Sequence, residues 1–189
     1  MEIVHPVPWF PAWGVTFSTP IENVDTLISI FNKWRPSERW LLLAYEVASS
    51  EVHLWTTWYA LRRRENLSGM TARTPDVEFL RLISGTHQIK SGFERAGLRK
   101  GDFSAWILYL PDEGKTKEFG EIKIKRDSYN DKNDEARIIS DNIGAKSMSK
   151  RPIPTKEGLL RLGVEVFYQD LTISEIEEVF LSHMALSDF

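Results

Sequence analysis

The sequence predicts an α+β fold, in which a small, mostly antiparallel sheet has its helices packed on one face. Three observations support this prediction. The 189 residues suit one domain. Apolar residues make up 42% of the chain and include seven Trp and ten Phe, enough to fill a core. The predicted elements run strand, helix, strand, three helices, strand, strand, helix, and helices bunched between strands are typical of this class. We therefore interpret residues 1–189 as a single domain.

The first strand is predicted at residues 13–17, after a proline-rich start. The first helix is predicted to begin at Thr19, with Pro20 at its first position and Glu22 completing a capping box. It should end before Pro36. Its apolar residues recur at helical spacing and predict a buried stripe of Val24, Leu27, Ile28, Phe31 and Trp34.

The second strand is predicted at residues 40–45, where a continuous apolar run indicates burial on both faces. A second helix should open at Ser49 or Ser50 and end near Arg64. Its predicted buried stripe is Val52, Trp55, Tyr59 and Ala60.

Two short helices should follow, one from Thr74-Pro75 to Gly85 and one from Thr86 to Gly97. The next strand is predicted at residues 104–110. A further strand is predicted at 163–168, and a capping box of Thr172 and Glu175 should begin the last helix.

Residues 112–151 form a predicted polar insertion, because they hold ten Lys or Arg, nine Asp or Glu and few large apolar residues. The alternation around Ile122 and Ile124 suggests an edge strand. The rest of the segment has the composition of a mobile loop.

Composition and motifs exclude several classes of site. The chain has no cysteine, which excludes disulfides, thiolate zinc sites and a cysteine nucleophile. It contains no phosphate-binding glycine loop, no nucleophile elbow and no helical pair of metal-ligating histidines. We therefore predict no catalytic residue, no metal and no cofactor. The start does not resemble a secretory signal and the apolar runs are too short to span a bilayer, so a cytoplasmic protein is expected.

Charge is unevenly distributed along the chain. Residues 49–101 hold nine Lys or Arg and five acids, a net charge of +4, whereas the remaining residues carry −7. A basic half of this kind could contact phosphate. The alternative is an ordinary surface with local scatter.

Several basic and ring-bearing residues are candidates for nucleic-acid contact. The run Arg62-Arg63-Arg64 could bind phosphate, although positive charge at a helix C-terminus is also favourable by itself. Trp58 could be an exposed stacking ring or part of the core. His87 and Gln88 could present donors outward or cap the helix locally. The predicted RNA-contacting residues are Arg62, Arg63, Arg64, Arg73, His87, Gln88, Arg95, Arg99, Lys100 and Trp58.

Two stretches resemble one known family. In the first, residues 46–101, a His53-Leu54 helix ends in the basic run and is followed by R-T-x-x-x-E-F-L-x-x-x-x-G-T-x-Q-I and by Gly97-Leu98. The second is the C-terminal TISEIEEVFLSHMALSDF. Together they resemble the PRPK-binding protein (TPRKB) family, the small kinase-binding subunit of the KEOPS complex. The motif residues are Arg73, Thr74, Glu78, Phe79, Leu80, Gly85, Thr86, Gln88 and Ile89. The proline-rich start and residues 112–151 depart from the family pattern.

The resemblance implies a non-catalytic subunit. Members of this family bind the small atypical kinase/ATPase of the complex and support its activity in making threonylcarbamoyladenosine in tRNA. Some are implicated in holding the tRNA, particularly its single-stranded acceptor end. We expect the kinase to contact the helices of residues 74–96, at Phe79, Leu82, Ile89 and Phe93; the alternative for Phe79 and Leu82 is a place in the core.

Two other functions stay open on sequence alone. One is a free-standing RNA-binding adaptor module without a kinase partner. The other is an enzyme of a new α+β type, which would require a deep polar pocket with convergent ionisable groups.

Overall fold

The computed structural model describes residues 9–112, 126–165 and 170–187. Within them, four strands form one sheet in the order β2-β3-β1-β4, and all neighbouring strands are antiparallel. The predicted α+β class and the antiparallel sheet are confirmed. The strands are β1 (Ala12–Phe17), β2 (Trp40–Ala44), β3 (Ser104–Tyr109) and β4 (Ala145–Met148).

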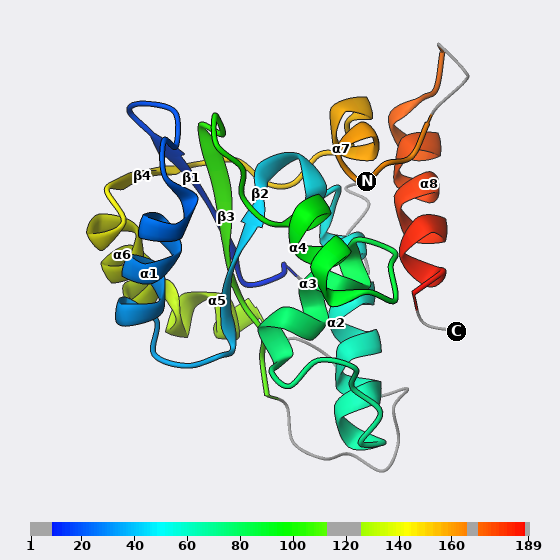
Figure 1. Cartoon of the computed structure of the whole chain (residues 1–189), viewed down its shortest axis with the longest axis horizontal. Helices are drawn as coiled ribbons and strands as arrows, with labels where there is room; N and C mark the ends of the chain where they lie inside the picture. Colours follow the sequence, from blue (N-terminus) through cyan, green and yellow to red (C-terminus); the bar gives the residue numbers. More distant parts are fainter. Residues whose placement is uncertain (1–8, 113–125, 166–169, 188–189) are drawn as a thin grey trace, which may run out of the picture.

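Helices cover both faces of the sheet, which corrects the expectation of a single covered face (Figure 1). One core cluster places Leu41, Leu43 and Trp106 against α2, α3 and α8. A second cluster places Leu42 and Ile107 against α1 and α6. The physical reason is that β2 is apolar at every position, so both of its faces must be shielded from water. The helices named here are α1 (Val24–Trp34), α2 (Glu51–Asn66), α3 (Pro75–Ile83), α6 (Asn133–Asn142) and α8 (Ile173–Ala185).

Helix α1 begins later than predicted. Its N-cap is Asn23, whose side-chain oxygen accepts a hydrogen bond from the N–H of Thr26 at 2.9 Å. The predicted capping box at Thr19 does not form, because the backbone of Ile21 pairs with the turn at residues 101–102 and stays extended. The helix ends at Trp34, before Pro36, as predicted.

Helix α2 starts at the predicted cap, Ser50, but buries a different face from the one predicted. Trp55 and Tyr59 are only half-buried and stack on each other with 5.4 Å between ring centroids. The buried face includes two polar residues, His53 and Thr57, and polar residues on a core face hide the hydrophobic periodicity. The side chains on this face are His53, Leu54, Thr57, Trp58 and Leu61.

The two helices predicted after Thr74 are confirmed as α3 and α4 (Ile89–Ala96). The structure also contains shorter helices that were not predicted. Helix α3 has Pro75 at its start and is followed by Gly85 at φ +63°, a backbone conformation that suits glycine. The other elements are η1 (Tyr45–Val47), α5 (Arg126–Asp131) and α7 (Lys156–Arg161).

Residues 126–148 form α5, α6 and β4 and not the predicted mobile loop. Small and branched side chains from this segment fill the second core cluster, notably Ala136, Ile139 and Ile143. The fourth strand is therefore β4 and not residues 163–168, of which 163–165 form no strand. The predicted edge strand around residues 122–124 and the positions 166–169 lie outside the described residues.

Candidate functional site

A buried ion pair organises the segment that carries the family resemblance. Glu78 and Arg81, one turn apart on α3, are 0% and 1% exposed and lie 2.5 Å apart. Glu78 also accepts the backbone N–H groups of Thr71 and Ala72 at 3.1 and 2.8 Å. Burial raises the pKa of Glu78, but the hydrogen bonds and the charge of Arg81 outweigh burial, and the pKa is lowered. The pair therefore stays ionised at neutral pH.

Arg81 connects this pair to two other parts of the chain. Its guanidinium donates to the carbonyl of Thr86, in the turn between α3 and α4, at 2.9 Å. It also donates to the carbonyl of Ser187, beyond the end of α8, at 3.3 Å. Several motif residues thus hold α3, the turn and the C-terminal segment together.

Two of the four predicted kinase contacts are core residues. Phe79 and Leu82 are both 0% exposed, so neither can touch a partner while α3 stays folded. This part of the prediction is wrong, because the core-facing side of α3 includes these positions. Ile89 is half-buried on α4, and Phe93 is 47% exposed. The accessible part of the predicted kinase surface therefore lies on α4.

Two of the predicted RNA contacts are also internal. Trp58 is fully buried and donates its ring N–H to the carbonyl of Pro111 at 2.9 Å, so it cannot stack on a base. Arg62 is 3% exposed and pairs with Glu65 at 2.5 Å and Asp112 at 3.1 Å. Arg62 is thus part of an internal ion-pair network and is not a surface cation.

The other predicted RNA contacts lie in three places. At the end of α2, Arg63 and Arg64 are half-buried, and Arg64 donates to the carbonyls of Gly69 and Ser187. Arg73 is exposed in the segment before α3. His87 and Gln88 are exposed in the turn before α4, and Arg95, Arg99 and Lys100 follow on and after that helix.

The basic residues near the end of α4 mostly serve local structure. Arg99 donates twice to the carbonyl of Glu94, at 3.0 and 2.6 Å, at the helix C-terminus. Arg95 reaches the carbonyl of Ser84 at 3.4 Å, and Lys100 lies 3.5 Å from Glu22 at the surface. The lysine keeps an exposed side chain that can contact other molecules.

An aromatic pocket, which we define by Trp9, Trp13, Tyr129, Lys150 and Arg151, is a candidate site that the sequence did not indicate. It has a volume of about 330 Å³ and lies beside β1 and β4. Trp13 and Tyr129 stack with 4.9 Å between centroids, and Trp9 meets Tyr129 edge-on at 6.0 Å. Trp9 is 40% exposed. A half-exposed indole beside a lysine is suited to bind a planar base that is attached to a phosphate.

Arg151 holds the aromatic pocket together. Its guanidinium carbon lies 4.8 Å from the Trp9 ring and 5.5 Å from the Tyr129 ring. Its N–H groups bind Glu51 at 2.5 Å and the carbonyls of Phe10 and Ala12. Because these donors are already engaged, the exposed Lys150 is the cation available to a phosphate at this pocket.

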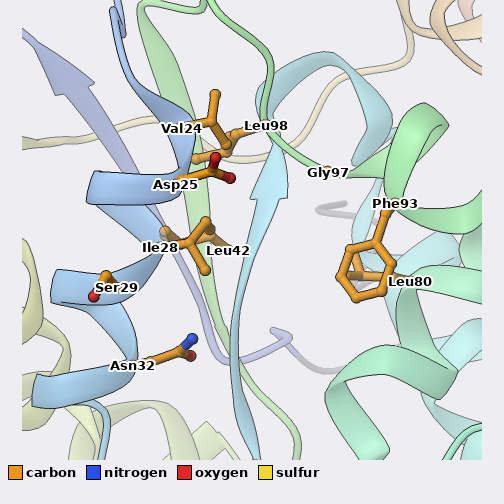
Figure 2. A pocket seen from close by; sticks show the side chains of 10 residues that line it. All are labelled: Val24, Asp25, Ile28, Ser29, Asn32, Leu42, Leu80, Phe93, Gly97 and Leu98. Carbon is orange, nitrogen blue, oxygen red and sulfur yellow. The ribbon is translucent and has the colours of Figure 1, made fainter. Parts of the chain in front are cut away.

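A second hollow, the β2 cleft, runs between α1 and the helices α3 and α4 (Figure 2). It has a volume of about 570 Å³. Val24, Ile28 and Asn32 line it from α1, and Leu80 and Phe93 from the opposite side. Among the described residues that line it, Asp25 alone is ionisable, and these residues do not bring together the acids and bases of an active site.

Both hollows assemble residues that are far apart in sequence. The aromatic pocket joins the N-terminal Trp9 to Tyr129 in the polar segment, and no local pattern links two such positions. Trp9 and Trp13, in the proline-rich start, are the sequence feature that could have pointed to this pocket. The β2 cleft depends on strand order, which periodicity does not specify.

In residues 9–112, 126–165 and 170–187, no cluster of three or more His, Cys, Asp or Glu could bind a metal ion. In the same residues no helix has the length and apolar character needed to cross a membrane. A scan against protein-family models found no match, and a search of curated proteins found no relative.

Proposed function

We propose that this chain is a non-catalytic subunit that binds the small atypical kinase of a KEOPS-type complex and engages tRNA for threonylcarbamoyladenosine modification. The observation that carries the proposal is the resemblance of residues 46–101, which the structure arranges as one packed unit of α2, α3 and α4. The motif residues of this unit divide into a buried scaffold around Glu78 and an exposed set that is free to act at the surface.

Two of the predicted contact residues, Ile89 within the motif and Phe93 beyond it, support a protein contact on α4. Phe93 presents an aromatic ring to solvent at 47% exposure, and Ile89 is half-buried on the same helix. Large aromatic side chains are common anchors at protein interfaces, where they fill pockets on the partner. We place the kinase contact at these two residues, in place of the buried Phe79 and Leu82.

Two surface features support an RNA contact. Arg73 and His87 extend from the turns before α3 and α4. The aromatic pocket adds the exposed Trp9 ring and Lys150, a combination that suits single-stranded RNA because stacking tolerates any base and lysine binds phosphate. The single-stranded acceptor end of tRNA has this chemistry.

Gel filtration with the purified kinase tests the proposal. We expect the two proteins to elute together as a 1:1 complex at micromolar concentrations. Phe93→Glu should abolish the complex, because a buried charge at the interface is unfavourable. The control is Phe103→Glu, which changes another exposed phenylalanine, at 54% exposure, outside α4. Separate elution of the native proteins at these concentrations would contradict the proposal.

The alternative is a free-standing RNA-binding adaptor module. The aromatic pocket favours it, since this pocket needs no kinase to bind RNA. That function predicts tRNA binding with an affinity that falls as salt rises, and no change in elution or activity of the kinase.

A further inference from the structure

We propose that the β2 cleft binds an extended peptide segment, which adds a fifth strand to the free edge of β2. The occupant is a segment of a partner protein with apolar side chains at alternate positions and a Lys or Arg placed opposite Asp25. This inference goes beyond the proposed function, because it concerns backbone recognition at the edge of β2 and does not depend on the identity of the kinase. Phe93 belongs to both surfaces, so a bound peptide and the kinase would compete for this side chain.

Strand β2 lies at one end of the strand order of the sheet. Among the described residues β2 pairs with β3 alone, so its other side is an open edge. Leu110, after β3, donates its N–H to the carbonyl of Arg39, before β2. The neighbouring Tyr109 donates its N–H to the carbonyl of Pro11, on the β1 side of β3. Hydrogen-bonding direction alternates along an antiparallel pair. The backbone N–H and C=O groups of Leu41 and Leu43 therefore point toward β3. Those of Leu42 point toward the open edge.

Arg35 protects one end of this edge. Arg35 donates to the carbonyl of Trp40 at 2.9 Å and to Asp76 at 2.5 Å, which bridges α1 to α3 across that end of the strand. Exposed sheet edges are normally blocked in this way, since unpaired backbone groups invite another strand. Two residues further on, Leu42 lines the β2 cleft and is 5% exposed, so a guest backbone has to enter the cleft to reach its N–H and C=O.

The walls of the cleft match the two faces of an added strand. Val24 and Ile28 of α1 lie on one side, and Leu80 and Phe93 lie on the other (Figure 2). Successive side chains of a strand point to opposite faces, so a guest strand at the normal spacing of about 4.8 Å would place alternate side chains against each wall. Apolar guest side chains would cover the exposed part of Phe93.

Backbone pairing and charge select the type of occupant. A bound α-helix satisfies its own backbone groups and would leave Leu42 without a partner. Asp25 is exposed at the α1 side of the cleft, and the structure gives it no ion pair among the described residues. A basic side chain on the guest would complement this carboxylate, which favours an extended peptide that carries Lys or Arg.

Peptide titration into the full ¹⁵N-labelled chain tests the inference. The probe is the acetylated, amidated peptide Thr-Val-Lys-Val-Thr-Val-Lys-Thr. Its matched control carries N-methyl groups at the valines, which remove backbone donors and keep the side chains. We expect hydrogen exchange of the Leu42 amide to slow by about tenfold on saturation, and N-methylation to weaken binding by about tenfold or more, as strand addition requires.

Variants locate the site. Asp25→Lys should weaken peptide binding by about fivefold, whereas Asp141→Lys makes the same charge change on α6 and should have no effect beyond general electrostatics. Both variants are at exposed positions, so both should fold. Equal loss of affinity in the two variants would show non-specific attraction and overturn the assignment.

Other outcomes also overturn the inference. These are no binding at about 1 mM peptide, equal affinity for the N-methylated peptide, or unchanged exchange at Leu42. A concentration-dependent dimer that protects Leu42 would assign the cleft to a second copy of the chain. A chain that takes the peptide as described but fails to elute with the kinase would contradict only the proposed function.

Discussion

At the scale of single residues, the ion pair of Glu78 and Arg81 has the largest structural role among the motif residues. Both side chains are buried, and together they bind the backbone of residues 71, 72, 86 and 187. Such a pair does not by itself make a protein more stable than apolar packing would. Removing one partner, however, leaves an unpaired buried charge.

Glu78→Gln should therefore lower the free energy of unfolding by about 3–5 kcal/mol, since it leaves the Arg81 guanidinium buried without its counter-charge. Urea denaturation at neutral pH measures the change. Glu178→Gln, at an exposed position of α8, is the matched control and should stay within about 0.5 kcal/mol of the native protein. A loss below about 1 kcal/mol for Glu78→Gln would show that water reaches the pair.

His53 makes stability depend on pH. Burial, with a smaller contribution from His183, lowers the pKa of His53 from 6.5 to about 3. Its Nδ1 accepts the N–H of Ser49 at 3.4 Å, so the folded protein holds a neutral ring. The unfolded chain takes up a proton near pH 6.5 and the folded chain does not. The stabilisation is therefore fully present above the unfolded pKa and is lost as pH falls toward the folded pKa.

Between about pH 7.5 and pH 5, His53 alone should reduce the free energy of unfolding by about 2 kcal/mol. Urea denaturation at both pH values, on the native protein and on His53→Gln, isolates this contribution as the part of the pH dependence that the variant loses. His87→Gln, at an exposed ring, is the control for the loss of one imidazole. An identical pH dependence in the native protein and His53→Gln would contradict the assignment.

At the scale of elements, the sheet and its helices follow from local patterns more closely than their packing does. The apolar runs at β2 and β3 predicted both strands within one or two residues, and Ser50 and Pro75 marked helix starts correctly. The Thr19 capping box was wrong because the long-range pairing of Ile21 with residues 101–102 keeps that segment extended. Tertiary contacts of this kind have no local sequence signal.

The candidate sites also show that local patterns predict some features of the chain and miss those set by tertiary packing. Arg73, His87 and Phe93 were predicted as accessible and are exposed, whereas Trp58 and Phe79 were predicted as contacts and are core residues. Residue type does not distinguish a core aromatic from a surface one on a short helix with apolar residues on several sides. The β2 cleft depends on strand order. The aromatic pocket depends on contacts more than 100 residues apart in sequence, as between Trp13 and Asn133.

The junction of α3 and α4 depends on Gly85. It has φ +63°, and a Cβ there would lie 2.5 Å from the carbonyl oxygen of His183 on α8. Gly85→Ala should destabilise the fold by about 1 kcal/mol from backbone strain, and by more from the clash with α8. Gly101→Ala is the matched control, because Gly101 has φ +94° and open space around its Cβ position. Thermal unfolding that ranks the two variants as equal would contradict this account of how α8 docks.

At the scale of the whole molecule, the candidate surfaces lie at opposite edges of the sheet. The aromatic pocket lies beside β4 and β1, and the β2 cleft lies at the other edge of the sheet. Strands β2 and β4 are at opposite sides of the sheet (Figure 1). RNA and an extended peptide could therefore bind at the same time, and a change at one edge should leave the other intact.

Lys150→Glu should weaken tRNA binding by about tenfold and reduce the slope of log K against log salt by about one, since it removes one phosphate contact at the aromatic pocket. Fluorescence anisotropy with labelled tRNA over a salt series gives both quantities. Lys33→Glu, an exposed lysine on the last turn of α1, is the matched control. Equal weakening by both variants would show that net charge alone governs RNA binding.

We propose that this protein acts by binding a kinase and RNA and catalyses no reaction of its own. The most direct measurement is the ATP hydrolysis rate of the purified KEOPS-type kinase, with and without the native chain. We predict that the chain alone hydrolyses no ATP and that its addition raises the rate of the kinase, with saturation at one equivalent. A kinase rate that stays unchanged at saturating chain would contradict the claim.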